Sequence, residues 1–384
     1  MGRTPLALVL TATLAVATAY GMLLLLPLQI KQLGGTEATF GMLTAVAAVP
    51  AAALLGTLLS FPDRVRPTVL LAGASLAYAA AAALLATLDS LGGALVVLTV
   101  VLGSTWSVVY TVGPMVVSER VPDDARAAYI GYLTGTIQLG FGIGPVLGGW
   151  LHSRGLTYPE TFAVAAGLAA TAAGLLALVP AGRSPVRLAR VSLYPALRNI
   201  VRSAARTPLV MILIMACLFT TMISFQATFA QSRGLSFDVF YISYTAAVIV
   251  VRLVVARFFR DTAIDGVVIG ATAGIAVALA CFLVVDTSTG RYAVASAVLG
   301  GAYGLALPAL QARAVNFAPV ADRSRMLPLA GLLFQIVILA FPVVAGAVIA
   351  GFGYQTVFVV LVALAVGLLA LSMPGKRLVL SEEH

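Results

Sequence analysis

Long apolar runs recur along the whole chain and constrain its fold more than any other feature. Each run is about 20 residues long, which is enough to cross a hydrocarbon core about 30 Å thick. Only 10% of the residues are charged, whereas a soluble domain has about 25%. Inside a bilayer the backbone must satisfy its own hydrogen bonds, and the runs lack the alternation of barrel strands. The sequence therefore predicts an all-α polytopic membrane protein.

We predict twelve membrane-spanning helices. The first six cover about 6–30, 37–60, 67–88, 92–117, 127–151 and 159–180, and the second six cover about 208–231, 237–259, 264–285, 292–315, 326–350 and 354–373. The hydrophilic stretch between the two sets contains several arginines and prolines. We therefore expect a six-helix bundle at 1–180, a cytoplasmic linker at 181–207, and a second six-helix bundle with a short tail at 208–384.

Basic residues are distributed unequally between the two sides that these spans define. About 18 lie on the side of both termini and the linker, and only Lys31, Arg154, Arg233 and Arg291 lie on the other. The positive-inside rule then predicts an inner-membrane protein with both termini in the cytoplasm. The net charge of +9 belongs to loops that face anionic lipid, so we expect lipid as a partner and no nucleic acid.

The two halves carry matching residues. A shift of 197 positions aligns Pro122 with Pro319, Arg126 with Arg323, Gln138 with Gln335, Pro145 with Pro342 and Gly149 with Gly346. A neighbouring shift of 201 positions aligns Glu37 with Asp238. A parallel repeat of six helices predicts a substrate site near the membrane midplane, between the halves, and favours alternating access.

A glycine-rich stretch in the fifth span reads GFGIGPVLGG over residues 140–149. The chain resembles the major facilitator superfamily along its whole length, and its match to that family's antiporter motif consists of Gly131, Gly140, Gly144, Pro145, Gly148 and Gly149. The resemblance implies twelve helices in two pseudo-symmetric bundles, and the motif is typical of exporters. Glycines four residues apart form a smooth strip that allows close helix contact. By the same resemblance we expect this strip to pack against helix eight of the other half, and we expect Gly144→Leu to impair transport without unfolding the protein.

The loops of the family pattern are matched less closely. Asp63 and Arg64 follow the second span three positions later than the family's acid and base, and Arg260 and Asp261 stand in swapped order in the second half. The resemblance therefore transfers no charge relay to this chain. Four charged loop residues remain candidates for coupling or gating: Asp63, Arg64, Arg126 and Arg323.

Three charged residues lie within or at the edge of the spans. Arg252 is well inside the eighth span, so it either extends to the cytoplasmic end and ties the helix to loop carbonyls or acids, or faces the cavity as an anion-binding or gating residue. Glu37 and Asp238 stand at matching helix starts. Each either stabilises a helix N-terminus or acts as a proton-binding or gating carboxylate in an outer vestibule.

Uncharged polar and aromatic residues fall at mid-span on helices that line the cavity in the resembling family. They are Tyr20, Trp106, Tyr110, Gln138, Gln226, Tyr244, Tyr303 and Gln335. Each one taken alone can hold neighbouring helices together, because a buried amide needs a partner. As a set they predict a neutral, hydrogen-bonding, aromatic-walled substrate cavity for a moderately polar or amphiphilic organic solute, with Arg252 as a further candidate for the cavity. A small inorganic cation would need several carboxylates instead.

No catalytic constellation is present in the sequence. His152 lies at a helix end, His384 is the last residue, and no GxxxxGK[ST] loop occurs. We expect no enzyme, no cofactor and no metal site. The leading hypothesis is a monomeric secondary active transporter that exports a small organic solute by alternating access, in antiport with protons. Uptake or facilitated diffusion is the alternative, and a non-transporting receptor or lipid-handling protein on the same fold is a remote one.

Overall fold

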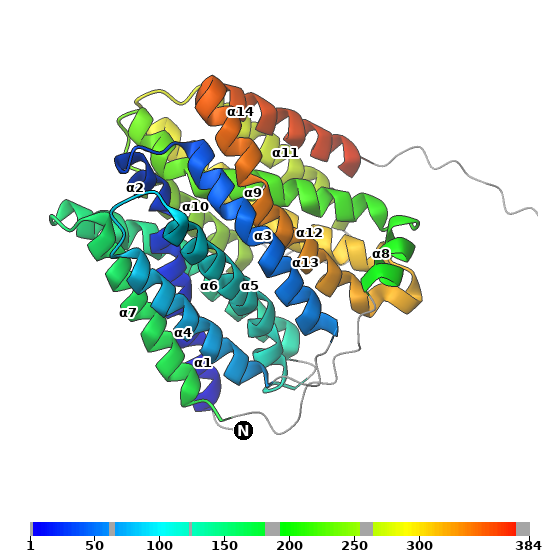
Figure 1. Cartoon of the computed structure of the whole chain (residues 1–384). Coiled ribbons are helices and arrows are strands. Elements are labelled where there is room, and N and C mark those ends of the chain that lie inside the picture. Colours follow the sequence, from blue (N-terminus) through cyan, green and yellow to red (C-terminus); the bar gives the residue numbers. More distant parts are fainter. Residues whose placement is uncertain (1–2, 61–65, 123–124, 181–192, 254–263, 374–384) are drawn as a thin grey trace, which may run out of the picture.

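The computed structural model describes residues 3–60, 66–122, 125–180, 193–253 and 264–373, and within these ranges the regular secondary structure is helical (Figure 1). The first half contains α1 (Arg3–Leu23), α2 (Leu26–Gln32), α3 (Glu37–Ser60), α4 (Pro67–Leu85), α5 (Gly93–Ser118), α6 (Arg126–Ser153) and α7 (Tyr158–Ala177). After α8 (Leu193–Val201), the second half contains α9 (Arg206–Ser232), α10 (Asp238–Leu253), α11 (Ile264–Leu283), α12 (Thr289–Phe317), the 3-10 turn η4 (Val320–Asp322), α13 (Arg323–Ala340) and α14 (Pro342–Ser372).

The described helices account for the twelve predicted spans. Ten stretches are long and apolar enough to cross a membrane, and one of them covers Arg325–Ser372. Gly353 interrupts that stretch with φ 80° and ψ 173°, a conformation that favours glycine, so the chain turns there between two spans. The remaining span is α10, whose predicted end near residue 259 lies outside the described residues.

Two spans are broken where the sequence predicts continuous helices. The first divides into α1 and α2 at Leu24–Leu25, with Pro27 in the first turn of α2. The eleventh divides at Phe341, and Pro342 begins the next helix. Proline has no N–H to donate and is favoured in the first turn of a helix, so it follows a break readily. In contrast, α6 runs through Pro145 without ending.

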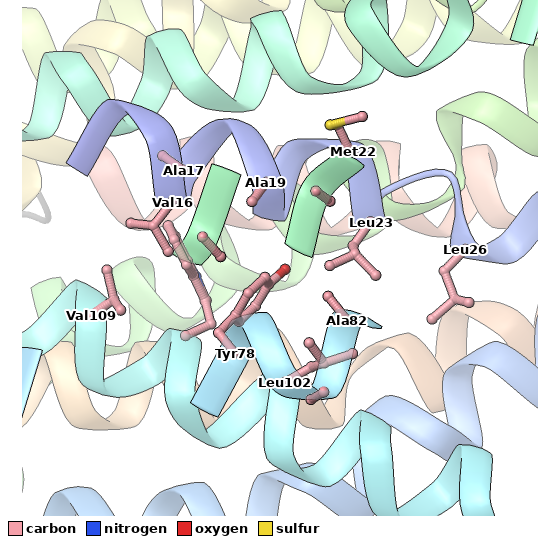
Figure 2. Packing of buried hydrophobic residues seen from close by; sticks show 14 of the residues in the cluster. Val16, Ala17, Ala19, Met22, Leu23, Leu26, Tyr78, Ala82, Leu102 and Val109 are labelled. Carbon is pink, nitrogen blue, oxygen red and sulfur yellow. The ribbon is translucent and has the colours of Figure 1, made fainter. Parts of the chain in front are cut away.

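Two large apolar clusters form the core. One is built mainly by α1 and α4–α7, and the other mainly by α9–α14. Figure 2 shows part of the first cluster, where side chains of α1 lie beside Tyr78 and Ala82 of α4 and Leu102 of α5. Each cluster therefore belongs mostly to one half, as the repeat predicts, although the exact bundle limits at 180 and 208 stay a prediction.

The ends of the spans define two sides of the molecule. The linker side carries the start of α1, α8 and the end of α14, and the far side carries α2 and the turns at 33–36, 154–157 and 233–237 (Figure 1). Within the predicted linker, α8 buries Ala196 and Ile200, and Asn199 donates a hydrogen bond to Asp322 (3.2 Å). The part of the linker at 193–201 is thus a helix that packs on the second half.

Candidate functional site

A cavity of about 1120 Å³ lies between the two halves. Its wall comes from α1, α5 and α6 of the first half and from α9–α13 of the second. Tyr132 and Leu253, which line it near the linker side, are 55% and 50% exposed, whereas Leu24 and Ile223 toward the far side are 4% exposed. The cavity is therefore open on the linker side and closed on the far side.

Most of the residues that we predicted for the cavity do line it: Tyr20, Trp106, Tyr110, Gln138, Arg252, Tyr303 and Gln335. They come from six helices: α1, α5, α6, α10, α12 and α13. The fold thus brings together residues that were predicted for the cavity from their mid-span positions in the sequence. That these residues bind a solute stays a prediction.

Gln226 and Tyr244 lie elsewhere and do not line this cavity. The Gln226 side chain accepts a hydrogen bond from the Tyr292 hydroxyl (2.9 Å) and donates to the Met222 sulfur (3.7 Å). Its amide is therefore used to join α9 to α12. Tyr244 is 4% exposed, its ring is 5.5 Å from that of Phe240, and Gly300 of α12 packs against its carbonyl. The Gln226 amide thus serves packing inside the second half, whereas the Tyr244 ring also lies 6.2 Å from that of Tyr303 in the cavity wall.

Aromatic rings form a continuous wall across the two halves. Tyr20 stacks on Trp106 with 4.2 Å between ring centroids, and Phe219 stacks on Tyr303 at 4.8 Å. Phe141 of α6 and Phe219 of α9 connect these pairs across the interface, at 6.5 Å. Phe219 was not singled out from the sequence, because a phenylalanine in an apolar span carries no signal that distinguishes a cavity wall from a lipid-facing side.

Two buried nitrogen atoms in the cavity wall lack hydrogen-bond partners among the described residues. They are Nε of Arg252 and Nε2 of Gln335, and the Gln335 side chain is only 3% exposed. Buried polar groups in proteins are nearly always paired. Because both unpaired atoms are donors, the wall is suited to a bound group that supplies oxygen acceptors.

The glycine strip of α6 does not pack where we expected it. Gly140 and Gly144 face the backbone of α1 at Ala17, Thr18 and Gly21, and a Cβ on Gly140 would lie 2.7 Å from the Ala17 carbonyl carbon. The predicted contact of this strip with helix eight is therefore wrong. Residues four apart share one helix face, and that face is turned toward the first helix of the same half. Gly144→Leu is consequently expected to force α1 from α6 and to damage the fold, contrary to our first expectation.

The remaining motif glycines have different surroundings. Gly148 faces Leu25, and Gly131 has open space around its Cα. The contact with α10 is made from another face of α6, where Gly142 packs against Thr245 and Gly149 packs against Phe237 and Asp238. A spacing of seven residues between Gly142 and Gly149 is the signal for that second face.

Glu37 holds three helices together on the far side. Its carboxylate is 3.0 Å from the Lys31 ammonium and accepts a hydrogen bond from the Tyr354 hydroxyl (2.8 Å). The same hydroxyl lies 2.6 Å from Oγ1 of Thr228 on α9. Glu37 is 7% exposed, so it is a buried carboxylate, paired through Oε1, that connects α3 to the second half. The sequence did not single out Tyr354, whose position directly after the turn glycine was the available signal.

Asp238, the counterpart of Glu37, is held more loosely. Ser236 donates a hydrogen bond to Oδ2 (3.1 Å), while Oδ1 is buried and has no partner among the described residues. A Cβ on Gly149 would lie 2.8 Å from that oxygen. Asp238 therefore stands at the contact between α6 and α10 with one oxygen free to take a proton.

The linker-side candidates are less informative. Asp63 and Arg64 lie outside the described residues, and Arg126 and Arg323 are exposed at the starts of α6 and α13. No structural feature here tests their coupling role. Among the described residues, no group of three or more His, Cys, Asp or Glu side chains could hold a metal ion.

A different arginine organises the linker side of the first half. Arg120, just after α5, donates hydrogen bonds to Thr68 (2.7 Å) and to the Pro180 carbonyl (2.9 Å), which ties α5 to α4 and to the end of the α7 segment. Burial raises the pKa of its neighbour Glu119, although the Arg120 guanidinium 3.3 Å away acts in the opposite direction. The pair is structural and lies away from the cavity.

Comparison with known proteins agrees with this architecture. A family profile described as the Major Facilitator Superfamily matches residues 8–290. The human organic anion transporter MFSD10 (TETRAN) superposes with a TM-score of 0.70 at 16% identity, covering 97% of this chain and 99% of that one. The nucleoside transporter NupG gives 0.72 at 14% identity, covering 96% and 99%.

An inward-facing, unoccupied structure of a bacterial homologue of the human lysosomal transporter Spinster is also similar. It gives a TM-score of 0.71 at 17% identity, covering 96% of this chain and 95% of that one. Curated protein sequences gave no match. At these identities the structural likeness shows the fold alone.

Proposed function

Because the chain belongs to the Major Facilitator Superfamily, we propose that it is a secondary active transporter that exports a small organic solute by alternating access, in antiport with protons. The observation that carries the proposal is the cavity between the halves, open on the linker side and closed on the far side. A binding site that one side can reach while the other is sealed is one of the two states that alternating access requires. That the chain is a transporter follows from its family, while the direction of solute transport and the coupling to protons are our proposal.

The orientation of this state is the one in which an exporter takes up its solute. Most arginines lie on the linker side, and the positive-inside rule places that side in the cytoplasm, with both termini. The open cavity then faces the cytoplasm and is ready to take up a solute there. The family's helix-five motif, which is typical of exporters, favours the same direction. On this basis we place the protein in the inner membrane, as a monomer surrounded by lipid.

Proton coupling has one structural candidate. Asp238 lies at the α10 start, against Gly149 of α6, with Oδ1 buried and unpartnered. An unpaired buried charge is costly. A carboxyl group at this position is therefore more easily shielded from the solvent of the far side when it is protonated and neutral. Binding a proton there favours closure of the far side, and losing it favours opening.

Reconstitution tests direction and coupling. Proteoliposomes loaded with labelled candidates, such as nucleosides, organic anions, drugs and sugars, are assayed for counterflow and for accumulation with and without an imposed pH gradient. An exporter in antiport accumulates solute on the acidic side. Accumulation that ignores the gradient would contradict the antiport and favour facilitated diffusion, and accumulation with the proton flux would favour uptake.

The cavity glutamines provide a matched test of the site. Replacing Gln138 and Gln335 together with alanine should abolish transport, because both amides line the cavity. The control replaces two glutamines outside the cavity, Gln231 and Gln355, and should transport normally. Equal rates in the two double variants, at equal protein yield, would remove the glutamines from the substrate site.

A further inference from the structure

The described cavity wall carries one positive charge and no negative charge. Among the described residues in the cavity wall, Arg252 is the one charged side chain, and the wall contains no aspartate or glutamate. Its buried Nε has no hydrogen-bond partner there. An unpaired charge at membrane depth is costly, and proteins keep such groups where function needs them.

The guanidinium of Arg252 faces the interior of the molecule. Arg252 of α10 lines the cavity together with Tyr110 of α5 and Tyr303 of α12. Arg252 forms no ion pair or hydrogen bond with another described residue, and the loop at 254–263 lies outside the described residues. Of the two roles open from the sequence, its position supports the one in the cavity.

Another polar group of the cavity wall also lacks an acceptor. The second unpartnered atom of the wall, Nε2 of Gln335, is a donor like Nε of Arg252. A carboxylate offers two oxygens, and a guanidinium binds a carboxylate through two parallel hydrogen bonds. A cation would find neither a carboxylate in the described wall nor relief from the charge of Arg252.

The rest of the wall is suited to a flat apolar body. The rings of Tyr20, Trp106, Phe141, Phe219 and Tyr303 form one connected surface. The volume of about 1120 Å³ slightly exceeds the range of drug-sized ligand sites, which is roughly 300–1,000 Å³. Room and aromatic surface are therefore present for one or more rings.

We propose that the transported solute is an organic monoanion, a carboxylate on an aromatic body, and that its carboxylate binds Arg252. Transport of this anion rests on the proposed transport function. Its binding site is supported separately by Arg252, Gln335 and the connected aromatic rings of the wall.

Calorimetric titration of the full chain in nanodiscs tests the selection. The probes are benzoate, 2-naphthoate and 1-pyrenebutyrate, each compared with its primary amide and with the amine that replaces its carboxylate. We expect at least one carboxylate to bind about tenfold or more tightly than its amide, and the amines to bind most weakly. No binding by any carboxylate, or an amide or amine that binds as tightly as the matching carboxylate, overturns the proposal.

Three variants assign the effect to Arg252. Losing a hydrogen-bonded charge partner should weaken carboxylate binding in Arg252→Gln about ten- to hundred-fold and leave amide binding unchanged. Arg252→Lys keeps the charge and should keep the preference for the carboxylate. Arg291→Gln removes a cation that is 64% exposed and far from the cavity, so it controls for net charge and should bind as the parent does.

Stability separates a binding role from a structural one. Because Arg252 is unpaired, Arg252→Gln without ligand should melt at the same temperature as the parent or higher. A lower melting temperature together with lost amide binding would mean that Arg252 supports the fold, and would overturn the proposal.

Proteoliposome assays keep the two proposals apart. Carboxylate binding that depends on Arg252 without transport of any probe would contradict the transport function and leave the anion site standing. Transport of amides or amines that Arg252→Gln does not change would leave the transport function standing and overturn the anion site.

Discussion

The two interfaces between the halves use matching residues and differ in how they hold a carboxylate. Gly149 of α6 faces Asp238 at the start of α10, and Gly346 of α14 faces Glu37 at the start of α3. Glu37 is paired with Lys31 and Tyr354, whereas Oδ1 of Asp238 has no partner among the described residues. One copy of the repeat therefore pairs its acid with a lysine and a tyrosine, and the other leaves one carboxylate oxygen unpaired among the described residues.

The interfaces also differ toward the linker side. Along α3 and α13 the apolar contact continues through Ala51 and Leu339 to Leu55 and Leu332. The contact between α6 and α10 ends near Gly142 and Thr245. Closer to the linker side, Gly131 of α6 has open space in the described structure. The α3–α13 interface is therefore suited to act as the pivot and the α6–α10 interface as the opening.

The largest effect is expected where a glycine meets backbone. A Cβ on Gly346 would overlap the Glu37 carbonyl, which cannot move aside, while a Cβ on Gly149 meets the side chains of Phe237 and Asp238, which can. Gly346→Leu should reduce transport to the level of empty liposomes, and Gly149→Leu should reduce it partly. Gly351→Leu, on the same helix with open space, is the control. Equal loss in the two interface variants would remove the proposed asymmetry.

The next effect concerns the pH dependence of transport. The charge of Asp238 acts on the phenols of Tyr241 and Tyr292, and no cation is paired with it among the described residues. Asp238→Asn, which imitates the protonated state, should abolish accumulation driven by a pH gradient and preserve counterflow. Glu37→Gln should keep the pH dependence. Gradient-driven transport that survives in Asp238→Asn would exclude this carboxylate from coupling.

A smaller effect is expected for Tyr354→Phe. The hydroxyl bonds both Glu37 and Thr228, and losing a hydrogen bond to a charged group costs about 1.5–3 kcal/mol. Hydrogen exchange at residues 37–41 should therefore become faster by about ten-fold or more, while exchange at the start of α10 stays unchanged. Tyr194→Phe, 76% exposed on α8, is the control. Unchanged exchange at residues 37–41 would show that the hydroxyl does not hold the α3 interface.

The smallest effect is expected for Lys31→Met. The Lys31 side chain is 37% exposed, and exposed ion pairs contribute about 0–1 kcal/mol. Transport should change less than about three-fold, and raising the salt concentration should imitate the substitution in the parent protein. Hydrogen exchange at residues 37–41 that becomes as fast as in Tyr354→Phe would mean that the ammonium, rather than the hydroxyl, holds Glu37.

Hydropathy predicted the spans well because membrane depth fixes their length. The helix over 37–60 was predicted at its observed bounds, and the other complete spans agree within a few residues. The breaks at Leu24–Leu25 and Phe341 were missed, since an apolar run looks the same whether it is continuous or broken. Pro27 and Pro342 were the available signs, yet Pro145 shows that a proline does not always end a helix.

The cavity was partly predictable for a different reason. Polar and aromatic residues are rare in the spans, so positions such as Gln138, Gln335 and Arg252 were easily noticed. Their helix faces could not be read, because a helix that is apolar all round gives no direction of burial. Gln226 shows the consequence: its amide joins α9 to α12 instead of facing the cavity.

The unpaired arginine has an electrical consequence. With an anion bound, the charges of Arg252 and solute cancel, so the loaded cavity is neutral when it changes sides. When empty, the cavity carries one positive charge, and each elementary charge moved across a membrane is worth about 2.3 kcal/mol per 100 mV. In the antiport that we propose, the carrier returns with a proton and without solute, and an interior-negative voltage then acts on the charge of Arg252 and pulls the cavity back toward the cytoplasm. The voltage of the cell would thus accelerate the step that resets the carrier.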